Sequence, residues 1–159
     1  MQKYGHLQYQ QIDKKKLIVV GEYDDGRKKY LAKEASVAFK IMRKEAQKDD
    51  VHLVIISGFR TKKYQKWLFG RAVKKYGSQQ EAAKHVAPPG NSEHHTGSAV
   101  DIGDEQYPKT DLQISFETTP AFIWMQQHAE EYGFILSFPK DNPAGVSYEP
   151  WHWRYMKKD

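Results

Sequence analysis

The order in which apolar patterns follow one another is the feature that most constrains the fold of this chain. From Tyr30 to about Lys48, apolar residues recur at the spacing of one helix face, which predicts an amphipathic helix. Residues 51–56 then form a β-branched apolar run of strand length. Further helices are expected at 61–77, 79–86 and 119–133, and further strands at 134–138 and 146–155. Because helices come early and in the middle while short strands cluster late, we expect an α+β fold with helices packed on a small, mostly antiparallel sheet.

Start and stop signals mark the ends of two of these helices. Thr61 and Thr119 are of a type that caps helices, and Pro120 suits a first turn because the N–H that proline lacks needs no partner there. Gly77 and Gly133 follow the last periodic residues, where glycine commonly ends a helix. These signals place one helix between Thr61 and Gly77 and another between Thr119 and Gly133.

The N-terminal part of the chain carries no export or membrane signal. Residues 1–27 are polar and irregular, with one apolar stretch at 17–20 that suits an edge strand. No stretch approaches the roughly 18 consecutive apolar residues of a membrane span, and residues 1–6 lack the apolar run of a signal peptide. Either the protein stays inside the cell, or its export segment is not part of this chain. Without repeats or linkers, residues 1–159 are expected to form a single domain.

Composition removes several classes of chemistry. The chain has no cysteine, which excludes thiol nucleophiles, thiolate metal sites and disulfide frameworks. Its formal net charge is +5, and the basic residues come in runs such as Lys14-Lys15-Lys16. No nucleic-acid-binding motif accompanies this charge, so we expect no nucleic acid partner, and the runs are interpreted as solvated helix faces and loops.

The stretch GNSEHHTGSAVDIGD, residues 90–104, brings two imidazoles and a carboxylate among small residues. A catalytic zinc site without cysteine uses imidazole and carboxylate, commonly as three protein ligands with a fourth position left for water. His94, His95 and Asp101 are the candidates in this stretch. Seven residues separate His94 from Asp101, which would place them on opposite faces of a regular strand. They converge only if the chain bends, and Gly97 is where a bend costs least.

A second stretch, YEPWHWRY at 148–155, can supply a third ligand. In a strand Trp151, Trp153 and Tyr155 would face one side, which suits a core, while His152 and Arg154 would face the other. Glu149 shares the side of His152 only if Pro150 distorts the entry to the strand, and proline is largely confined to strand starts, edges and bulges. His152 and Glu149 are therefore expected at the same site.

These residues together match the parts of a hydrolytic zinc site. Three ligands would hold Zn²⁺, which brings the pKa of a water in the open position down to about 7. Glu149, a carboxylate that is not a ligand, would take the proton of the water and pass it to the leaving amine. Arg60 would stabilise the oxyanion or pair with a substrate carboxylate. Each residue alone also has a structural interpretation, as a surface histidine, an ion-pair member or part of an aromatic core.

Three motifs resemble those of a known family. Residues 92–101 resemble the S-x-H-x-x-G-x-A-x-D motif of VanY-type D-alanyl-D-alanine carboxypeptidases and the related L,D-carboxypeptidases, zinc peptidases that trim the stem peptides of bacterial peptidoglycan. Residues 149–155 resemble their second signature, E-P-W-H-x-R-[YF], and Ser57-Gly58-Phe59-Arg60 with Gln65 resembles a third. The order and spacing of all three agree, from about residue 30 to the end.

The resemblance implies a role for each residue. His94, Asp101 and His152 would bind one Zn²⁺ per chain, which selects His94 over His95. Glu149 would be the catalytic base, Arg60 would stabilise the transition state, and Gln65 and Ser92 would help hold the terminal peptide of the substrate. The implied fold is the compact α+β fold of these peptidases, shared with the hedgehog signalling domain.

The function implied is hydrolysis of the terminal D-alanine of peptidoglycan stem peptides. L,D-carboxypeptidase action on tetrapeptide stems, endopeptidase cleavage of a cross-link, and a non-catalytic, metal-stabilised binding domain are the alternatives. The expected partner is the stem peptide, the expected location is the cell envelope, and a monomer is expected. Two departures bear on substrate preference: Ser137-Phe138 stands where many members have arginine and an aromatic residue, and the helix carrying Gln65 begins Thr61-Lys62-Lys63.

Overall fold

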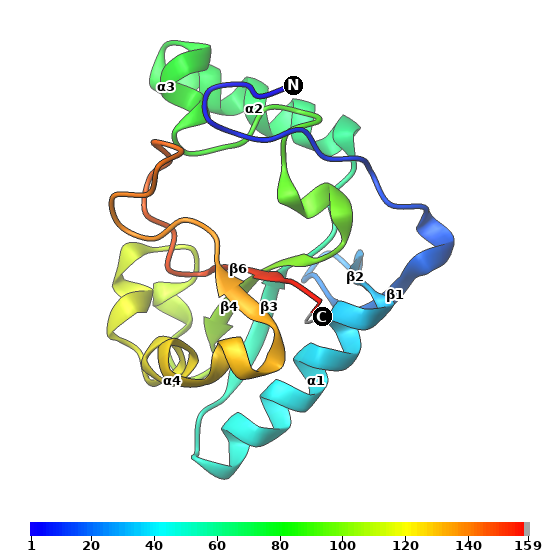
Figure 1. Ribbon diagram of the computed structural model, residues 1–159, viewed down its shortest axis with the longest axis vertical. Coiled ribbons are helices and arrows are strands. Elements are labelled where there is room, and N and C mark those ends of the chain that lie inside the picture. The colour runs from blue at the N-terminus through cyan, green and yellow to red at the C-terminus, as the bar shows by residue number, and fades with distance from the viewer. Residues whose placement is uncertain (158–159) are drawn as a thin grey trace.

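A computed structural model describes residues 1–157 and has the expected α+β architecture (Figure 1). Its main sheet has four antiparallel strands in the order β3-β4-β6-β5. These strands are β3 (Leu53–Ser57), β4 (Ala99–Asp104), β5 (Phe134–Leu136) and β6 (His152–Tyr155). A separate antiparallel hairpin consists of β1 (Leu17–Glu22) and β2 (Lys28–Ala32). The α-helices are α1 (Lys33–Lys48), α2 (Lys62–Tyr76), α3 (Gln79–Ala83) and α4 (Pro120–His128).

Short 3₁₀ helices complete the chain. They are η1 (Lys14–Lys16), η2 (Glu93–Thr96), η3 (Pro108–Thr110), η4 (Ile114–Thr118) and η5 (Ala129–Tyr132). None of the helices in residues 1–157 is long and apolar enough to cross a membrane.

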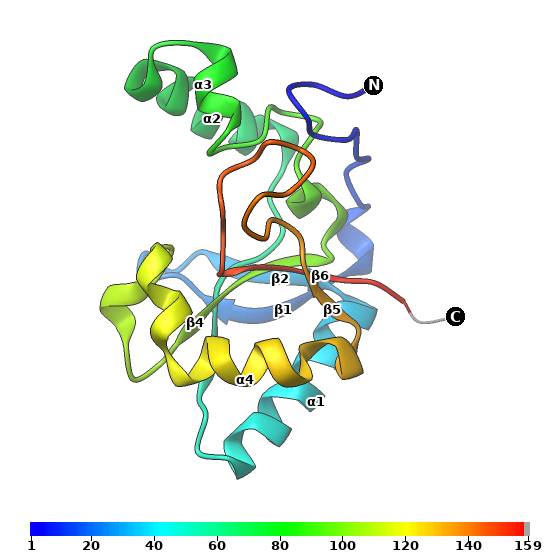
Figure 2. The same ribbon diagram turned by 60° about the vertical axis from the view of Figure 1, so that its left-hand side comes forward.

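The two sides of the main sheet differ in what covers them. Helices α1 and α4 lie against one side, and α2, α3 and the long loops before β4 and β6 lie on the other (Figures 1 and 2). The main core includes Phe39, Met42, Ile102, Phe122 and Trp153, all buried between α1, α4 and the sheet. A smaller apolar cluster joins α2 to α3.

The expected helix signals are confirmed. The Thr61 hydroxyl accepts from the Tyr64 N–H at 3.0 Å, and the Thr119 hydroxyl accepts from the Phe122 N–H at 3.2 Å. Gly77 and Gly133 adopt φ angles of 86° and 88°, in the left-handed region that glycine enters without strain. After α4 the last turn tightens into η5 before Gly133, so the expected helix ends in 3₁₀ geometry.

The first helix begins later than its periodicity predicts. Tyr30 and Leu31 belong to β2, where Leu31 pairs with Ile18 of β1, and α1 starts at Lys33. Residues 17–20, which the sequence predicts as an edge strand, lie in β1 and pair with Tyr30 and Leu31 of β2 in the hairpin. In β2 the Leu31 side chain is fully buried. Long-range pairing therefore overrides a local helical pattern.

Other boundaries are also shorter or shifted. The strand expected at 146–155 covers only 152–155, because residues before it form a loop that closes in a turn, with the His152 N–H donating to the Glu149 carbonyl at 3.2 Å. The helix expected at 79–86 ends at Ala83, and the strand expected at 134–138 ends at Leu136. The strand expected at 51–56 runs from 53 to 57.

Candidate metal centre

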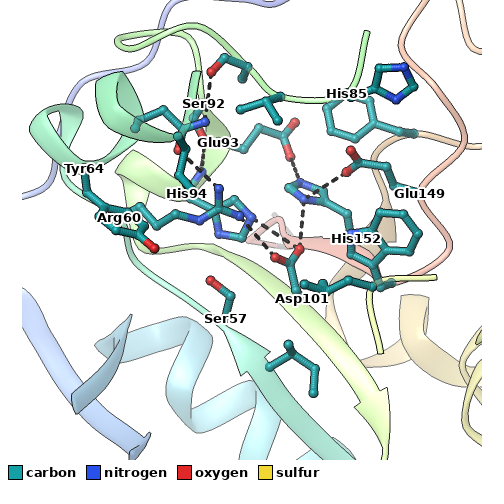
Figure 3. A pocket seen from close by; sticks show the side chains of 18 of the residues that line it. Ser57, Arg60, Tyr64, His85, Ser92, Glu93, His94, Asp101, Glu149 and His152 are labelled. Atoms are coloured by element: carbon teal, nitrogen blue, oxygen red, sulfur yellow. Dashed lines mark hydrogen bonds and ion pairs between the residues drawn. The ribbon is translucent and has the colours of Figure 1, made fainter. Parts of the chain in front are cut away.

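Three side chains from separate elements meet on the loop-covered side of the sheet. His94 comes from η2, Asp101 from β4 and His152 from β6, and Asp101 and His152 are direct cross-strand partners. Asp101 Oδ1 lies 3.3 Å from His94 Nε2 and 3.3 Å from His152 Nδ1 (Figure 3). One ligand atom of each residue lies within 4.8 Å of the other two, and all three residues are buried. The expected convergence is therefore present.

The bend that brings His94 toward Asp101 is at Gly97, as expected. Gly97 adopts a φ of 72°, between η2 and β4. Its carbonyl accepts from the Ala32 N–H at 2.8 Å, and a Cβ at this position would lie 3.0 Å from that nitrogen. The hairpin therefore packs against a site where only glycine fits without strain.

Two buried polar atoms at the centre of this cluster have no hydrogen-bond partner. They are His94 Nε2 and Asp101 Oδ1. The other ring nitrogen of His94, Nδ1, donates to the Gly58 carbonyl at 2.8 Å, which leaves Nε2 with its lone pair toward Asp101. Buried polar atoms are rarely left without partners. An imidazole nitrogen and a carboxylate oxygen facing one point suit a divalent cation of the zinc type.

Glu93 completes the cluster and was not singled out from the sequence. Its Oε2 accepts from His152 Nε2 at 2.8 Å and from the Ser137 hydroxyl at 2.6 Å. With Nε2 bonded to Glu93, the other ring nitrogen of His152, Nδ1, faces Asp101. Metal-binding histidines commonly donate their second N–H to a carboxylate in this way. This rule predicts that a metal-binding His152 has a carboxylate partner. The sequence alone does not show which acidic residue that is, because Glu93 lies 59 residues away from His152.

The electrostatics of the cluster favour a positive charge at its centre. Burial, helped by the Arg60 charge, lowers the pKa of His94 to about 4, so this imidazole is neutral. Burial also opposes charge on His152, but the nearby carboxylates of Asp101 and Glu93 outweigh it and raise the pKa of His152 to about 10, so binding of a metal at Nδ1 requires release of the proton there. Burial would raise the pKa of Glu93, yet the His152 and Ser137 bonds lower it to about 2. Burial would likewise raise the pKa of Asp101, yet His94, His152 and Arg60 hold it well below its usual range, so two ionised carboxylates surround the place where a cation would lie.

Glu149 lies beside the cluster without belonging to the group of three. Its Oε2 is 3.7 Å from His152 Nδ1, because the turn before β6 brings residue 149 to the side of residue 152. Burial raises the pKa of Glu149 to about 7, with the Asp101 charge acting in the same direction and His152 against it. A carboxyl group of this kind can both accept and release a proton near neutral pH.

Arg60 and Gln65 form the adjoining wall. Arg60 Nη2 donates to Asp101 Oδ2 at 3.1 Å, and Nη1 donates to Gln65 Oε1 at 3.2 Å. Gln65 is buried and donates to the Ala87 carbonyl at 2.9 Å. Arg60 therefore has a fixed orientation next to the cluster.

Ser92 and His95 have structural contacts of their own. The Ser92 hydroxyl accepts from the His94 N–H at 3.2 Å, which caps η2. His95 is fully buried, donates from Nδ1 to the Arg60 carbonyl at 2.8 Å and accepts at Nε2 from the Gly90 N–H at 3.0 Å. Since both ring nitrogens of His95 are used, it ties the Arg60 segment to the loop and is not part of the group of three.

The group of three, Glu93 and Glu149 border one cavity of about 460 Å³, and His95 does not (Figure 3). The sequence-predicted residues on its wall are Arg60, Gln65, Ser92, His94, Asp101, Glu149 and His152. Additional walls come from His6, Tyr23, His85 and Phe138. A cavity of this size can hold a small ligand such as the end of a peptide.

Comparison with known proteins points to one family. The sequence model described as "VanY: D-alanyl-D-alanine carboxypeptidase" matches residues 28–158. The putative carboxypeptidase YodJ of Bacillus subtilis (strain 168) is 39% identical over 134 residues, which cover 83% of this chain and 48% of YodJ. Across the curated relatives that it matches, the chain spans 38% to 62% of their length.

Solved structures show the same fold. One is the structure of the LdcB LD-carboxypeptidase, which was reported to reveal the molecular basis of peptidoglycan recognition. It superposes with a TM-score of 0.79 at 35% identity, covering 91% of this chain and 69% of LdcB. A mutant of the D,D-pentapeptidase VanY from the VanB-type vancomycin resistance cassette, in complex with Zn(II), superposes with a TM-score of 0.71 at 25% identity, covering 96% of this chain and 88% of VanY.

Proposed function

This chain belongs to the family of VanY D-alanyl-D-alanine carboxypeptidases, and we propose that it is a zinc-dependent carboxypeptidase that hydrolyses the terminal D-alanine of peptidoglycan stem peptides. The observation that carries the proposal is the pair of unpartnered buried atoms, His94 Nε2 and Asp101 Oδ1, beside a Glu149 carboxyl with a pKa of about 7. A structural zinc site would have four protein ligands and no use for Glu149.

His94, Asp101 and His152 would hold the zinc ion, as the donor set of two imidazoles and one carboxylate fits that metal. When bound, zinc supplies Lewis-acid polarisation of the scissile carbonyl and activation of a water molecule. The Zn(II) complex of the similar VanY structure supports this choice of metal. Glu93 would hold His152 in the tautomer whose Nδ1 is free.

Glu149 is the general base of the proposed reaction. It takes a proton from the attacking water at a carboxylate oxygen, and the same oxygen then gives the proton to the departing amino group of D-alanine. The buried position of Glu149 keeps its pKa near the pH at which both transfers are feasible. The enzyme therefore needs no second acid for the leaving group.

Arg60 stabilises the negative charge that develops on the carbonyl oxygen. Its guanidinium is held by Asp101 and Gln65, so little reorganisation is needed when the charge appears. Gln65 and Ser92 border the same cavity and are proposed to hold the terminal peptide of the substrate. The basic surface is proposed to favour anionic wall material, and the protein to act as a monomer at the cell envelope.

An L,D-carboxypeptidase acting on tetrapeptide stems is the second candidate. The higher TM-score of the LdcB structure favours it, at 0.79 against 0.71 for VanY. The two reactions use the same metal centre and differ in which residue the cavity accepts before the terminal D-alanine. Endopeptidase action and a non-catalytic binding domain are weaker alternatives, since the cavity is suited to a peptide end and Glu149 is free to act as a base.

One assay separates these functions. The zinc-loaded protein is incubated with pentapeptide and tetrapeptide stems, and the products are identified by mass. Loss of one alanine from the pentapeptide alone supports D,D-cleavage, and loss from the tetrapeptide supports L,D-cleavage. The Glu149→Gln variant is the matched control and should cleave neither stem at a comparable rate. Absence of any product with both stems contradicts the proposed hydrolase.

A further inference from the structure

Helix α2 accounts for the positive net charge of the chain. The helix has five lysines and one arginine, and no aspartate or glutamate. The whole chain has 25 basic and 20 acidic side chains, so the residues outside α2 have a formal net charge of −1. The basic character of the protein therefore comes from one helix, which lies at the opposite end of the molecule from α1 (Figures 1 and 2).

The cations of α2 have no anionic partners. Within residues 1–157, none of its six basic side chains is in an ion pair. On α1, by contrast, Lys48 pairs with Glu45 at 2.7 Å. Lys62 and Lys63 also stand in the first turn of α2, where the helix dipole disfavours positive charge. The stability of the helix therefore does not account for this pattern of charge.

An exposed tryptophan lies among these cations. Trp67 is 53% exposed, and its ring stacks on that of Tyr64 with the ring centres 5.7 Å apart. The guanidinium carbon of Arg71 lies 4.9 Å from the centre of the Trp67 ring. These contacts restrict the ring while leaving half of it in water. Hydration suits exposed lysines, whereas covering the indole ring with a partner would be favourable.

Trp67 belongs to a stripe on the outer face of α2. Lys63, Trp67, Gly70 and Lys74 follow one another at intervals of four, three and four residues, which is the spacing of one helix face, and all four are exposed. A Cβ on Gly70 would have no atom within 4 Å, so packing within the fold does not require the glycine, which is unfavourable in a helix interior. Gly70 leaves the face low beside Trp67, which allows close approach of an extended surface.

A phospholipid bilayer with anionic headgroups matches both the charge and the aromatic ring. Anionic lipids attract clustered lysines and arginines. An indole ring is favoured at the level of the headgroups, where its apolar body and its N–H are both accommodated. We propose that the outer face of α2 is a peripheral docking surface for an anionic lipid bilayer, with Trp67 among the headgroups. The surface does not depend on the metal centre or on hydrolysis.

Docking through α2 holds the metal-centre cavity close to the bilayer. Gln65 and Leu68, on the opposite face of the same helix, line that cavity. Phe69 joins α2 to the apolar cluster that it shares with α3, so the helix is part of the packed fold. A contact on the outer face therefore positions the whole domain and not a loose segment.

Cosedimentation with vesicles measures this binding on the zinc-loaded full chain. The protein should bind vesicles of phosphatidylglycerol and phosphatidylcholine in about equal parts, be released by added salt, and not bind vesicles of phosphatidylcholine alone. Each cation at an anionic surface contributes about 5-fold to the partition coefficient, so Lys63→Gln combined with Lys74→Gln should lower it about 25-fold. Lys40→Gln combined with Lys44→Gln, at two exposed lysines of α1, is the matched control and should change it little.

Tryptophan fluorescence reports where the ring lies. Binding should shift the emission to shorter wavelength, and Trp67→Phe should abolish the shift, because the other tryptophans are buried or half-buried. No binding to the anionic vesicles, or an equal loss in the two double variants, overturns the docking surface. Binding with unchanged emission overturns the placement of Trp67 among the headgroups. Tighter binding to soluble polyphosphate or to a single-stranded oligonucleotide than to the vesicles overturns the choice of a bilayer.

Discussion

Replacing Glu93 by glutamine should weaken zinc binding although Glu93 is not a ligand. Glu93 is ionised, since its pKa is lowered to about 2, and its Oε2 accepts from His152 Nε2 at 2.8 Å. Hydrogen bonds to charged groups contribute about 1.5–3 kcal/mol, and loss of such a partner behind a metal ligand costs about 10- to 100-fold in affinity. Glutamine keeps the shape but not the charge, so we expect the zinc dissociation constant to rise by about 10-fold or more.

Competition for zinc against a chromophoric chelator at neutral pH measures this change. Glu149→Gln is the matched control, because Glu149 borders the same cavity and lies near His152 but is not assigned to hold its tautomer. It should retain zinc, and its thermal unfolding without metal should be measured beside that of Glu93→Gln. An unchanged dissociation constant for Glu93→Gln, in a protein that unfolds at the usual temperature, would refute the role of Glu93.

Three further predictions follow from the structure. His94→Ala should abolish zinc binding, whereas His95→Ala should keep it. The buried ring of His95 makes two hydrogen bonds, so His95→Ala should lower the free energy of unfolding by about 2–4 kcal/mol. Equal loss of metal in both variants would contradict the choice of His94 as the ligand. Gly97→Ala should destabilise the fold by about 1–3 kcal/mol in denaturant unfolding, because φ is 72° there; an unchanged midpoint would show that the bend is not strained. Burial lowers the pKa of His6 below 6.5, so as the pH falls the unfolded chain is protonated at His6 before the folded protein is. The free energy of unfolding should therefore fall as the pH drops below about 6.5. His6→Gln should reduce this pH dependence, and an identical slope of stability against pH in both proteins would contradict the role of His6.

Much of the candidate site could be predicted from the sequence because its ligands lie in short, specific motifs. His94 and Asp101 sit within ten residues of Ser92, and the glycine that bends the chain between them is visible in the same stretch. The position of Glu149 beside His152 also followed from the proline between them. The roles of these residues stay predictions until they are measured.

The features that were missed depend on contacts between distant segments. Leu31 fits a helix by local spacing, but pairing with Ile18 places it in a strand. Glu93 lies inside a quoted motif, yet its partners Ser137 and His152 come from loops and strands far along the chain. Periodicity reports the face of one element and carries no information about which residue of another element will lie against it.

The metal centre is tested most directly by anomalous diffraction at the zinc edge from crystals of the zinc-loaded protein. We predict one zinc peak per chain, bound by His94 Nε2, an Asp101 carboxylate oxygen and His152 Nδ1, with Glu149 outside the coordination sphere and one position open to solvent. Zinc at another place, or a fourth protein ligand that closes the site, would contradict the assignment of this cluster as the centre of a hydrolase.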